Sequence, residues 1–329
     1  SAKSSVRNSL YDEVYEHLDR SEDTCNWIKE RLVHFLGSND KFLNITGSAG
    51  RGKSVLAEWV GERLARPLDH RLYTVLSYNF PWDSPKEATP LACVKSFLFQ
   101  LLERSVGDVA LYERLVQAFE VYSKTSNAGN LEATLWGTLR TGLLAAKRAE
   151  TSIVLLTDGC DEMSEKNVKE FHQALQRCVA DLSRTHVITF SRPVAALKDG
   201  SKVFEITQKE VHEDIESHLK QTLSKSIHYR DLDIREREQI VESLVNKSKG
   251  NFLWAFYVGR LLNRENSCDA FRARSKGVSS ELSDVIRIAV DCLDLQKNEM
   301  LQHLLSFMLN LHSCCFGYHW MLLFSNIKK

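Results

Sequence analysis

Two kinds of apolar pattern alternate along the first two thirds of the chain. Short runs rich in β-branched and aromatic residues predict strands, whereas apolar residues that recur on one helical face predict helices. The predicted strands cover about residues 41–46, 72–80, 153–157, 186–190 and 203–206. Helices are predicted around them at about 9–18, 24–36, 55–60, 91–102 and 131–148. This order predicts an α/β fold with a three-layer arrangement, in which helices flank a parallel sheet of about five strands.

Only helical patterns follow the last predicted strand. Helices are predicted at 211–223, 234–246 and 252–262, and Lys249-Gly250 separates the last two in the manner of a helix stop. Beyond a polar, charged segment at 263–276, helices are predicted at about 279–293 and 298–311. We therefore divide the chain into a helical lead-in (1–40), an α/β domain (41–207), a helical domain (208–265) and the incomplete start of a further helical region (266–329).

A glycine-rich loop separates the first predicted strand from the helix after it. Residues 47–54 read Gly-Ser-Ala-Gly-Arg-Gly-Lys-Ser and fit the phosphate-binding pattern Gly-x-x-x-x-Gly-Lys-Ser/Thr without a mismatch. Glycines let successive N–H groups and the positive end of the helix dipole converge on phosphates. Lys53 is expected to reach the β- and γ-phosphates, and Ser54 the Mg²⁺ ion. The residues predicted to hold the nucleotide are Gly47, Ser48, Ala49, Gly50, Arg51, Gly52, Lys53, Ser54 and Val55.

Three carboxylates follow the apolar run at 153–157, which is typical of a strand covered on both faces. Asp158 stands at the carboxyl end of this strand and is predicted to hold Mg²⁺ beside Ser54, directly or through water. Asp161 and Glu162 come one short turn later, where a carboxylate can orient or deprotonate a water that attacks the γ-phosphate. The alternative is a solvated acidic turn that caps the next helix. The buried strand and the phosphate loop together favour a Walker B site.

Arg192 ends the strand that begins near His186 and precedes Pro193. Ligands of parallel sheets bind beyond the carboxyl ends of the strands, so Arg192 is placed to sense the γ-phosphate. From spacing alone, a surface arginine that pairs with a nearby acid is the more common outcome. Both interpretations stay open at this point.

Composition and charge describe an ordinary globular chain. The 329 residues are 43% hydrophobic and 26% charged, and 43 basic residues balance 43 acidic ones, so we expect no nucleic-acid partner. Eight cysteines without a CxxC pair, and no signal-like amino terminus, predict a cytoplasmic protein with reduced thiols.

The charge-poor stretch at 301–324 is interrupted by polar residues and is predicted to be a buried helix, not a membrane span. The start at Ser1 suggests a fragment of something longer.

These motifs resemble, in order and spacing, those of the NACHT NTPases of the signal-transducing (STAND) class, particularly their fungal Nod-like-receptor members. Residues 158–162 match the family's acidic motif, in which an Asp and a small residue precede an acidic pair. Residues 190–193, Phe-Ser-Arg-Pro, are similar to its Thr-Ser-Arg-Pro motif except at the first position. Residues 213–219 and 250–255 resemble the Asp-Ile helix and the Gly-x-Phe-Leu-Trp-Ala segment of its helical domain. The resemblance covers about residues 20–262 and includes the lead-in at 24–28.

The resemblance implies a P-loop sheet with an extra strand between the two Walker strands, and it raises Arg192 to a sensor of the γ-phosphate. It also implies that residues 250–255 pack near the nucleotide base. The implied cofactors are ATP or ADP, with GTP possible, and Mg²⁺. Region 266–329 would begin a winged-helix domain, although no winged-helix histidine can be assigned. The implied partners are proteins, or a second copy, that engage effector and sensor domains missing from this chain.

The leading hypothesis is a nucleotide-controlled signalling switch that binds ATP or GTP and hydrolyses it slowly. In this hypothesis Lys53, Asp161, Glu162 and Arg192 serve catalysis, while Ser54 and Asp158 hold the metal. The alternative is an ADP-locked scaffold or interaction module without significant turnover. A P-loop kinase of small molecules is a third, weaker hypothesis, because nothing in the sequence suggests an acceptor site or an arginine-rich lid.

Overall fold

The computed structural model describes residues 24–68, 71–104, 109, 112–113, 116, 120, 128–148 and 152–291. Its centre is a five-stranded sheet in which every pair of neighbours is parallel. The strands are β1 (Phe42–Thr46), β2 (Tyr73–Asn79), β3 (Ser152–Asp158), β4 (Thr185–Ser191) and β5 (Lys202–Glu205), and they lie in the order β2-β3-β4-β1-β5. The predicted α/β fold is thereby confirmed, and β4 is the extra strand between β1 and β3.

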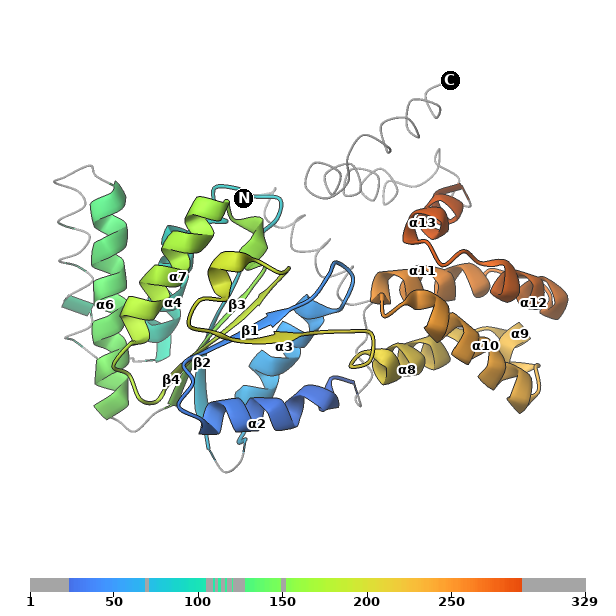
Figure 1. Ribbon diagram of the computed structural model, residues 1–329, viewed down its shortest axis with the longest axis horizontal. Helices are drawn as coiled ribbons and strands as arrows, with labels where there is room; N and C mark the ends of the chain where they lie inside the picture. The colour runs from blue at the N-terminus through green and yellow to red at the C-terminus, as the bar shows by residue number, and fades with distance from the viewer. Residues whose placement is uncertain are drawn as a thin grey trace, which may run out of the picture.

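Helices cover both faces of this sheet (Figure 1). One apolar cluster joins α2 (Lys29–Gly37) and α3 (Lys53–Leu64) to one face, whereas α4 (Pro90–Arg104), α6 (Ala128–Arg148) and α7 (Glu165–Val179) pack in a second cluster on the other. The alternation within β3 explains this division, because Val154 and Leu156 belong to the first cluster and Ile153 and Leu155 to the second. The central strands β1, β3 and β4 are therefore buried on both sides, whereas the edge strands β2 and β5 are partly exposed.

A helical region follows β5. Its helices are α8 (His212–Leu223), α9 (Ile227–Arg230), α10 (Ile234–Ser248), α11 (Phe252–Leu262), α12 (Cys268–Gly277) and α13 (Leu282–Asp291). Buried residues of this region, among them Val211, Trp254 and Phe271, belong to the same apolar cluster as α2 and α3. The helical region thus shares a core with one face of the sheet, while the division into domains at residue 207 stays a prediction.

The lead-in before β1 is fixed to the helical region by a buried carboxylate. Asp214 of α8 accepts hydrogen bonds from the Cys25 N–H (3.0 Å) and from Trp27 Nε1 (2.9 Å). Burial raises the pKa of Asp214, and these two hydrogen bonds oppose the rise. The bond between Trp27 and Asp214 joins residues 187 positions apart. It fixes the short helix η1 (Asn26–Ile28), and α2 directly after it, against α8.

Several predicted elements need correction. Helix α12 occupies residues that were predicted to form a polar segment without a helix, and α7 was not delimited by the sequence pattern. The predicted helices at 9–18 and 298–311, and the charge-poor stretch at 301–324, lie outside the described residues. Within the described part of the chain, no helix combines the length and the apolar character needed to cross a membrane.

Candidate nucleotide-binding site

The glycine loop joins the buried strand β1 to the first turn of α3. Gly50 and Gly52 adopt left-handed conformations with φ of 79° and 76°, which favour glycine. Gly52 is the N-cap of α3 and no side chain caps this helix. The first N–H groups of α3, with the positive end of its dipole, therefore offer an anion site where the sequence predicts phosphates.

Lys53 hydrogen-bonds the main chain of this loop. Its Nζ donates hydrogen bonds to the carbonyl oxygens of Gly47 (2.8 Å) and Ser48 (3.1 Å). Burial lowers the pKa of Lys53, and the nearby carboxylates Asp161 and Asp158 counteract this effect. The ammonium group is thus held at the mouth of the loop by weak acceptors that phosphate oxygens can replace.

Ser54 and Asp158 come together as predicted for a metal pair. The Ser54 hydroxyl hydrogen-bonds the Asp158 carboxylate, and Asp158 is only 8% exposed. Burial raises the pKa of Asp158, while the Ser54 hydroxyl, the Gly159 N–H and the Lys53 charge lower it. A hydroxyl and a buried carboxylate are hard oxygen donors, so this pair fits Mg²⁺.

The acidic turn after β3 depends on a glycine. Gly159 has φ of 72°, and a Cβ at this position would lie 2.9 Å from the main-chain oxygen of Phe80. The tight turn leads directly into the short helix η2 (Cys160–Glu162), which carries Asp161 and Glu162. The small residue of the acidic motif is therefore needed both for its conformation and for its lack of a side chain.

Arg192 joins this acidic turn from the end of β4. Its main-chain N–H and its Nε donate to the two carboxylate oxygens of Asp161, at 2.9 and 2.6 Å. One terminal nitrogen donates to Glu162 Oε1 at 3.2 Å. The pairing with a nearby acid that the sequence offered as an alternative is therefore present. The predicted roles of Arg192, Asp161 and Glu162 toward a γ-phosphate stay predictions.

Glu162 has the chemistry of a proton acceptor. Burial and the charge of Asp161 raise its pKa, while Arg192 and Lys53 lower it. A carboxylate with a raised pKa binds a proton more readily than an ordinary glutamate. Asp161 differs, because both of its oxygens already accept hydrogen bonds from Arg192.

The turn between α10 and α11 closes over the glycine loop (Figure 1). The Phe252 N–H donates to the Gly50 carbonyl at 2.8 Å, and Arg51 donates from a terminal nitrogen to the Lys249 carbonyl at 2.7 Å. A Cβ on Gly52 would lie 3.1 Å from the Phe252 ring, and one on Gly50 only 2.4 Å from Asn251 Oδ1. The segment that was expected near the base thus contacts the phosphate loop itself.

Sequence reasoning did not find the contacts made by Arg51 and Lys249. Arg51 was assigned only to the loop, and Lys249 only to a helix stop. They are 198 positions apart, so no local pattern connects them. The one available signal was the helix stop at Lys249-Gly250, where both residues have positive φ and end α10 abruptly.

A family model supports the grouping of these elements. The model described as Nephrocystin 3, N-terminal, matches residues 23–192. The matched part begins just before η1 and ends at Arg192, so it contains the phosphate loop and the acidic turn. No curated protein matches the chain in sequence.

The solved structures that match this fold in part belong to proteins with low sequence identity to this chain. PCH-2 of C. elegans is 11% identical with a TM-score of 0.39, and the match covers 79% of this chain and 65% of that one. Cdc6p from Pyrobaculum aerophilum is 12% identical with a TM-score of 0.45, covering 85% and 70%. A chain of the Drosophila ORC structure bound to GC-rich DNA and Cdc6 is 14% identical with a TM-score of 0.36, covering 93% and 50%. At these identities and TM-scores, the three similarities carry no argument about function.

Proposed function

The chain belongs to the nephrocystin 3 N-terminal family, and on this premise we propose that it is a nucleotide-controlled switch of the NACHT type. In this proposal it binds ATP, or GTP, together with Mg²⁺ and hydrolyses the triphosphate slowly. The supporting observation is the convergence of Lys53, Ser54 and Asp158 at a glycine loop that opens an uncapped helix. A positive charge, a metal-binding oxygen pair and free helix N–H groups are what a triphosphate needs.

Binding would rearrange the lysine first. Lys53 exchanges the carbonyl oxygens of Gly47 and Ser48 for phosphate oxygens, which are stronger acceptors because they are charged. Ser54 and Asp158 would hold the Mg²⁺ ion, in place of the hydrogen bond that now joins them. When bound there, Mg²⁺ would supply positive charge that offsets the charge developing on the phosphates. The loop N–H groups fix the direction of the triphosphate.

The arginine and the two acids divide the hydrolytic roles. Asp161 accepts from the main chain and Nε of Arg192 and so acts as its positioning residue. Glu162 accepts a longer hydrogen bond, 3.2 Å, from a terminal nitrogen of Arg192. A γ-phosphate would attract that nitrogen and release Glu162 to orient a water and take its proton. This sequence of events favours Glu162 over Asp161 as the base.

The contact between the glycine loop and the α10–α11 turn supports a switch. Gly50 and Arg51 bond directly to Phe252 and Lys249. A phosphate that draws the loop inward would therefore change bonds to the helical region. In this proposal the bonds of Gly50 and Arg51 couple the nucleotide state to the position of the helical region.

One observation favours the second candidate, an ADP-locked scaffold. Arg192, Asp161 and Glu162 already form a closed set of ion pairs, and the side chain of Asp161 is only 10% exposed. If these pairs persist with bound nucleotide, Glu162 has no proton-accepting role. Occupancy without turnover would then be the whole activity.

Lys53→Ala and Glu162→Gln separate the two candidates. We expect Lys53→Ala to weaken nucleotide binding by about tenfold or more, because a charged hydrogen-bond donor is lost. Its matched control is Lys166→Ala, which removes an exposed lysine of α7. Glu162→Gln should bind nucleotide normally but release phosphate about 100-fold more slowly. Calorimetry measures the first effect and single-turnover phosphate release the second.

Control variants show which results would contradict the proposed site and the proposed hydrolysis. Glu165→Gln, in the exposed first turn of α7, should leave hydrolysis unchanged. Nucleotide binding that is equally strong in Lys53→Ala and Lys166→Ala would contradict the proposed site. Phosphate release that is equally slow in the wild type and Glu162→Gln would reject the switch in favour of the scaffold. In an active enzyme, the raised pKa of Glu162 places the acid limb of the rate profile above that of an ordinary glutamate.

A further inference from the structure

Three side chains with metal-binding atoms meet in the helical region. His228 lies in α9, Asp231 is the residue that ends this helix, and Cys268 is the first residue of α12. One imidazole nitrogen, one carboxylate oxygen and the thiol sulfur all lie within 4.8 Å of one another. Helices α9 and α12, which carry these residues, lie at the end of the helical region far from the sheet (Figure 1). We propose that the cluster formed by His228, Asp231 and Cys268 binds a divalent cation of the zinc class.

The donor types select the ion. A cysteine sulfur and an imidazole nitrogen prefer Zn²⁺ and similar borderline-soft metals, whereas Mg²⁺ and Ca²⁺ prefer sets made only of oxygen. One carboxylate oxygen completes three protein ligands. His228 and Cys268 are half-buried and Asp231 is exposed, so the fourth position of a tetrahedral ion faces solvent and a water can fill it.

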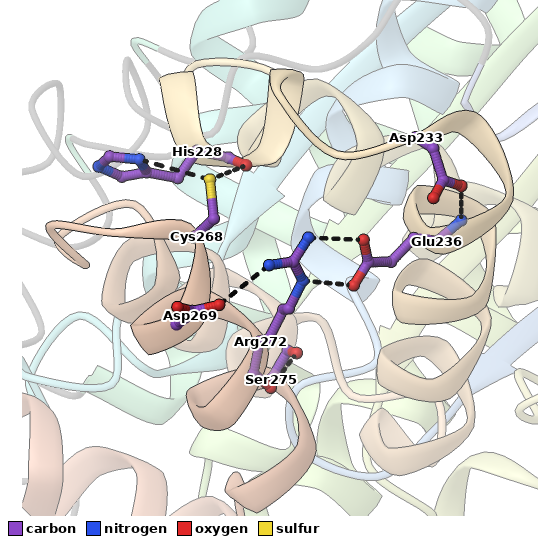
Figure 2. Close-up of polar contacts among 7 residues, drawn as sticks. All are labelled: His228, Asp233, Glu236, Cys268, Asp269, Arg272 and Ser275. Atoms are coloured by element: carbon purple, nitrogen blue, oxygen red, sulfur yellow. Dashed lines mark hydrogen bonds and ion pairs between the residues drawn. The ribbon is translucent and has the colours of Figure 1, made fainter.

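The spacing of the ligands suits one small ion. His228 and Asp231 are three positions apart, so they lie on the same side of the α9 turn. Figure 2 shows Cys268 beside His228, with its sulfur 4.0 Å from Nδ1 and 3.7 Å from the main-chain oxygen of His228. In a tetrahedral zinc site the sulfur and nitrogen lie about 3.5 Å apart. Small rotations of the two side chains are enough to reach that separation.

The helices that carry the ligands are held together independently of any ion. The rings of Tyr229 and Phe271, each next to or near a ligand in sequence, lie 6.0 Å apart, and Phe271 is fully buried. Arg272 of α12 also donates to both carboxylate oxygens of Glu236 in α10, at 2.6 and 3.1 Å, which ties α12 to a third helix of the region (Figure 2). A preorganised pair of helices means that the ion need not order the chain in order to bind.

Cys268 is accessible to an ion from solution. Cys268 opens the ten-residue helix α12, whose N-cap is Ser267. Of the free cysteines in the described residues, Cys25, Cys93, Cys160 and Cys178 are buried, so Cys268 is the one accessible to an ion from solution.

A zinc titration of the full chain tests the site. The protein is stripped with a chelator and desalted, then titrated with Zn²⁺ against a fluorescent zinc indicator, with excess Mg²⁺ present to occupy oxygen-only sites. We expect Cys268→Ser, His228→Ala and Asp231→Asn each to weaken one zinc site by about tenfold or more. Asp269→Asn is the matched control, because this exposed carboxylate neighbours Cys268 but pairs with Arg272. It should leave zinc binding unchanged.

A second ion distinguishes coordination from adventitious binding. Co²⁺ substituted for Zn²⁺ should give the intense ligand-field bands of a tetrahedral site and a sulfur-to-cobalt charge-transfer band, and Cys268→Ser should remove the latter. Asp231→Asn changes an exposed side chain, so it tests the site even if the other variants fold poorly. Zinc affinity and cobalt spectra that are the same in the wild type and in all three ligand variants would overturn the proposal, as would a wild type that binds no zinc. Histidines and cysteines at 312–319, outside the described residues, would hold zinc equally in every variant.

Discussion

At the scale of single residues, burial shifts the charged groups of the site toward their neutral forms. It raises the pKa of Asp158 and Glu162 and lowers that of Lys53. Each shift is opposed by an opposite charge within the same cluster. The proximity of acids and bases thus favours the charged forms that burial disfavours. Removing one member changes the protonation of the others, so single substitutions here are not additive.

At His186, a hydrogen bond with the Ser38 main chain, not an opposite charge, opposes the effect of burial on the pKa. This histidine lies in the fully buried strand β4, and its ring packs edge-on against Phe35 with centroids 5.3 Å apart. Burial, followed by the positive charges of Lys41 and Arg71, lowers its pKa from 6.5 to about 4. Its Nδ1 is buried and has no hydrogen-bond partner among the described residues. His186 is thus a neutral core residue whose protonation opposes folding.

We predict that His186 makes the protein less stable in mild acid. Between pH 6.5 and pH 4 the unfolded chain binds a proton at His186 and the folded chain does not, so stability falls as the pH falls. The loss amounts to about 3 kcal/mol across this range. His186→Gln should lack that part of the pH dependence, as measured by urea unfolding at pH 7 and pH 5. His34→Gln, in the last turn of α2, is the control and should keep it. Equal slopes in His186→Gln and the wild type would contradict the prediction.

At the scale of elements, the strands were easier to predict than the polar helices. Each strand is a short apolar or β-branched run, and the helices between successive strands predict parallel pairing. The position of β4 between β1 and β3 was expected only from the family resemblance. Helix α12 was missed because its sequence is polar and its described buried residues are only Phe271 and Ser275. Its cap at Ser267 and its contacts with α9 and α10 stabilise it instead of a continuous apolar face. Tertiary contacts of this kind leave no periodic signal in the sequence.

The candidate site was predictable because its residues follow predicted strands directly. Lys53, Ser54 and Asp158 follow β1 and β3, and the carboxyl ends of parallel strands lie at one edge of a sheet. Local motifs were therefore enough to bring these residues together. The bond from Arg51 to Lys249 could not be inferred, because it depends on how the helical region docks on the loop.

The α10–α11 turn gives a prediction about this docking. Gly250 has φ of 78°, and a Cβ there would lie 1.7 Å from a terminal nitrogen of Arg51 and 2.9 Å from the Cα of Gln208. Gly250→Ala should therefore destabilise the protein by about 1–3 kcal/mol, because both the conformation and the close approach are lost. The midpoint of urea unfolding measures this cost. Gly277→Ala is the matched control, since nothing lies within 4 Å of a Cβ at that position.

A second substitution tests whether contact with Arg51 causes the cost of Gly250→Ala. Arg51 is the flexible partner, whereas Gln208 contributes main chain. The double variant Arg51→Ala with Gly250→Ala should cost less than the sum of the two single variants. Strictly additive costs would show that the turn and the glycine loop are not in contact, and would weaken the proposed coupling.

At the scale of the whole molecule, one apolar cluster connects the phosphate loop to the helical region. It contains Leu56 and Val60 of α3 together with Trp254 and Val258 of α11. Helices α4, α6 and α7 belong to the other cluster, on the far side of the sheet. A displacement at the loop therefore has a packed route to α11, whereas its route to α7 crosses the sheet.

This difference predicts where bound nucleotide changes the protein. With Mg²⁺ and a slowly hydrolysed triphosphate at about 100 times its dissociation constant, binding should stabilise the folded chain by about 2.7 kcal/mol. A switch should in addition change amide hydrogen exchange in the α10–α11 turn and in α11, and it should do so differently for triphosphate and diphosphate. Local opening in α7 should respond much less. Lys53→Ala is the control, because it should remove these changes at the same nucleotide concentration. If triphosphate and diphosphate protect the glycine loop but leave identical exchange in α11, the loop binds nucleotide without moving the helical region, and the scaffold is the correct function.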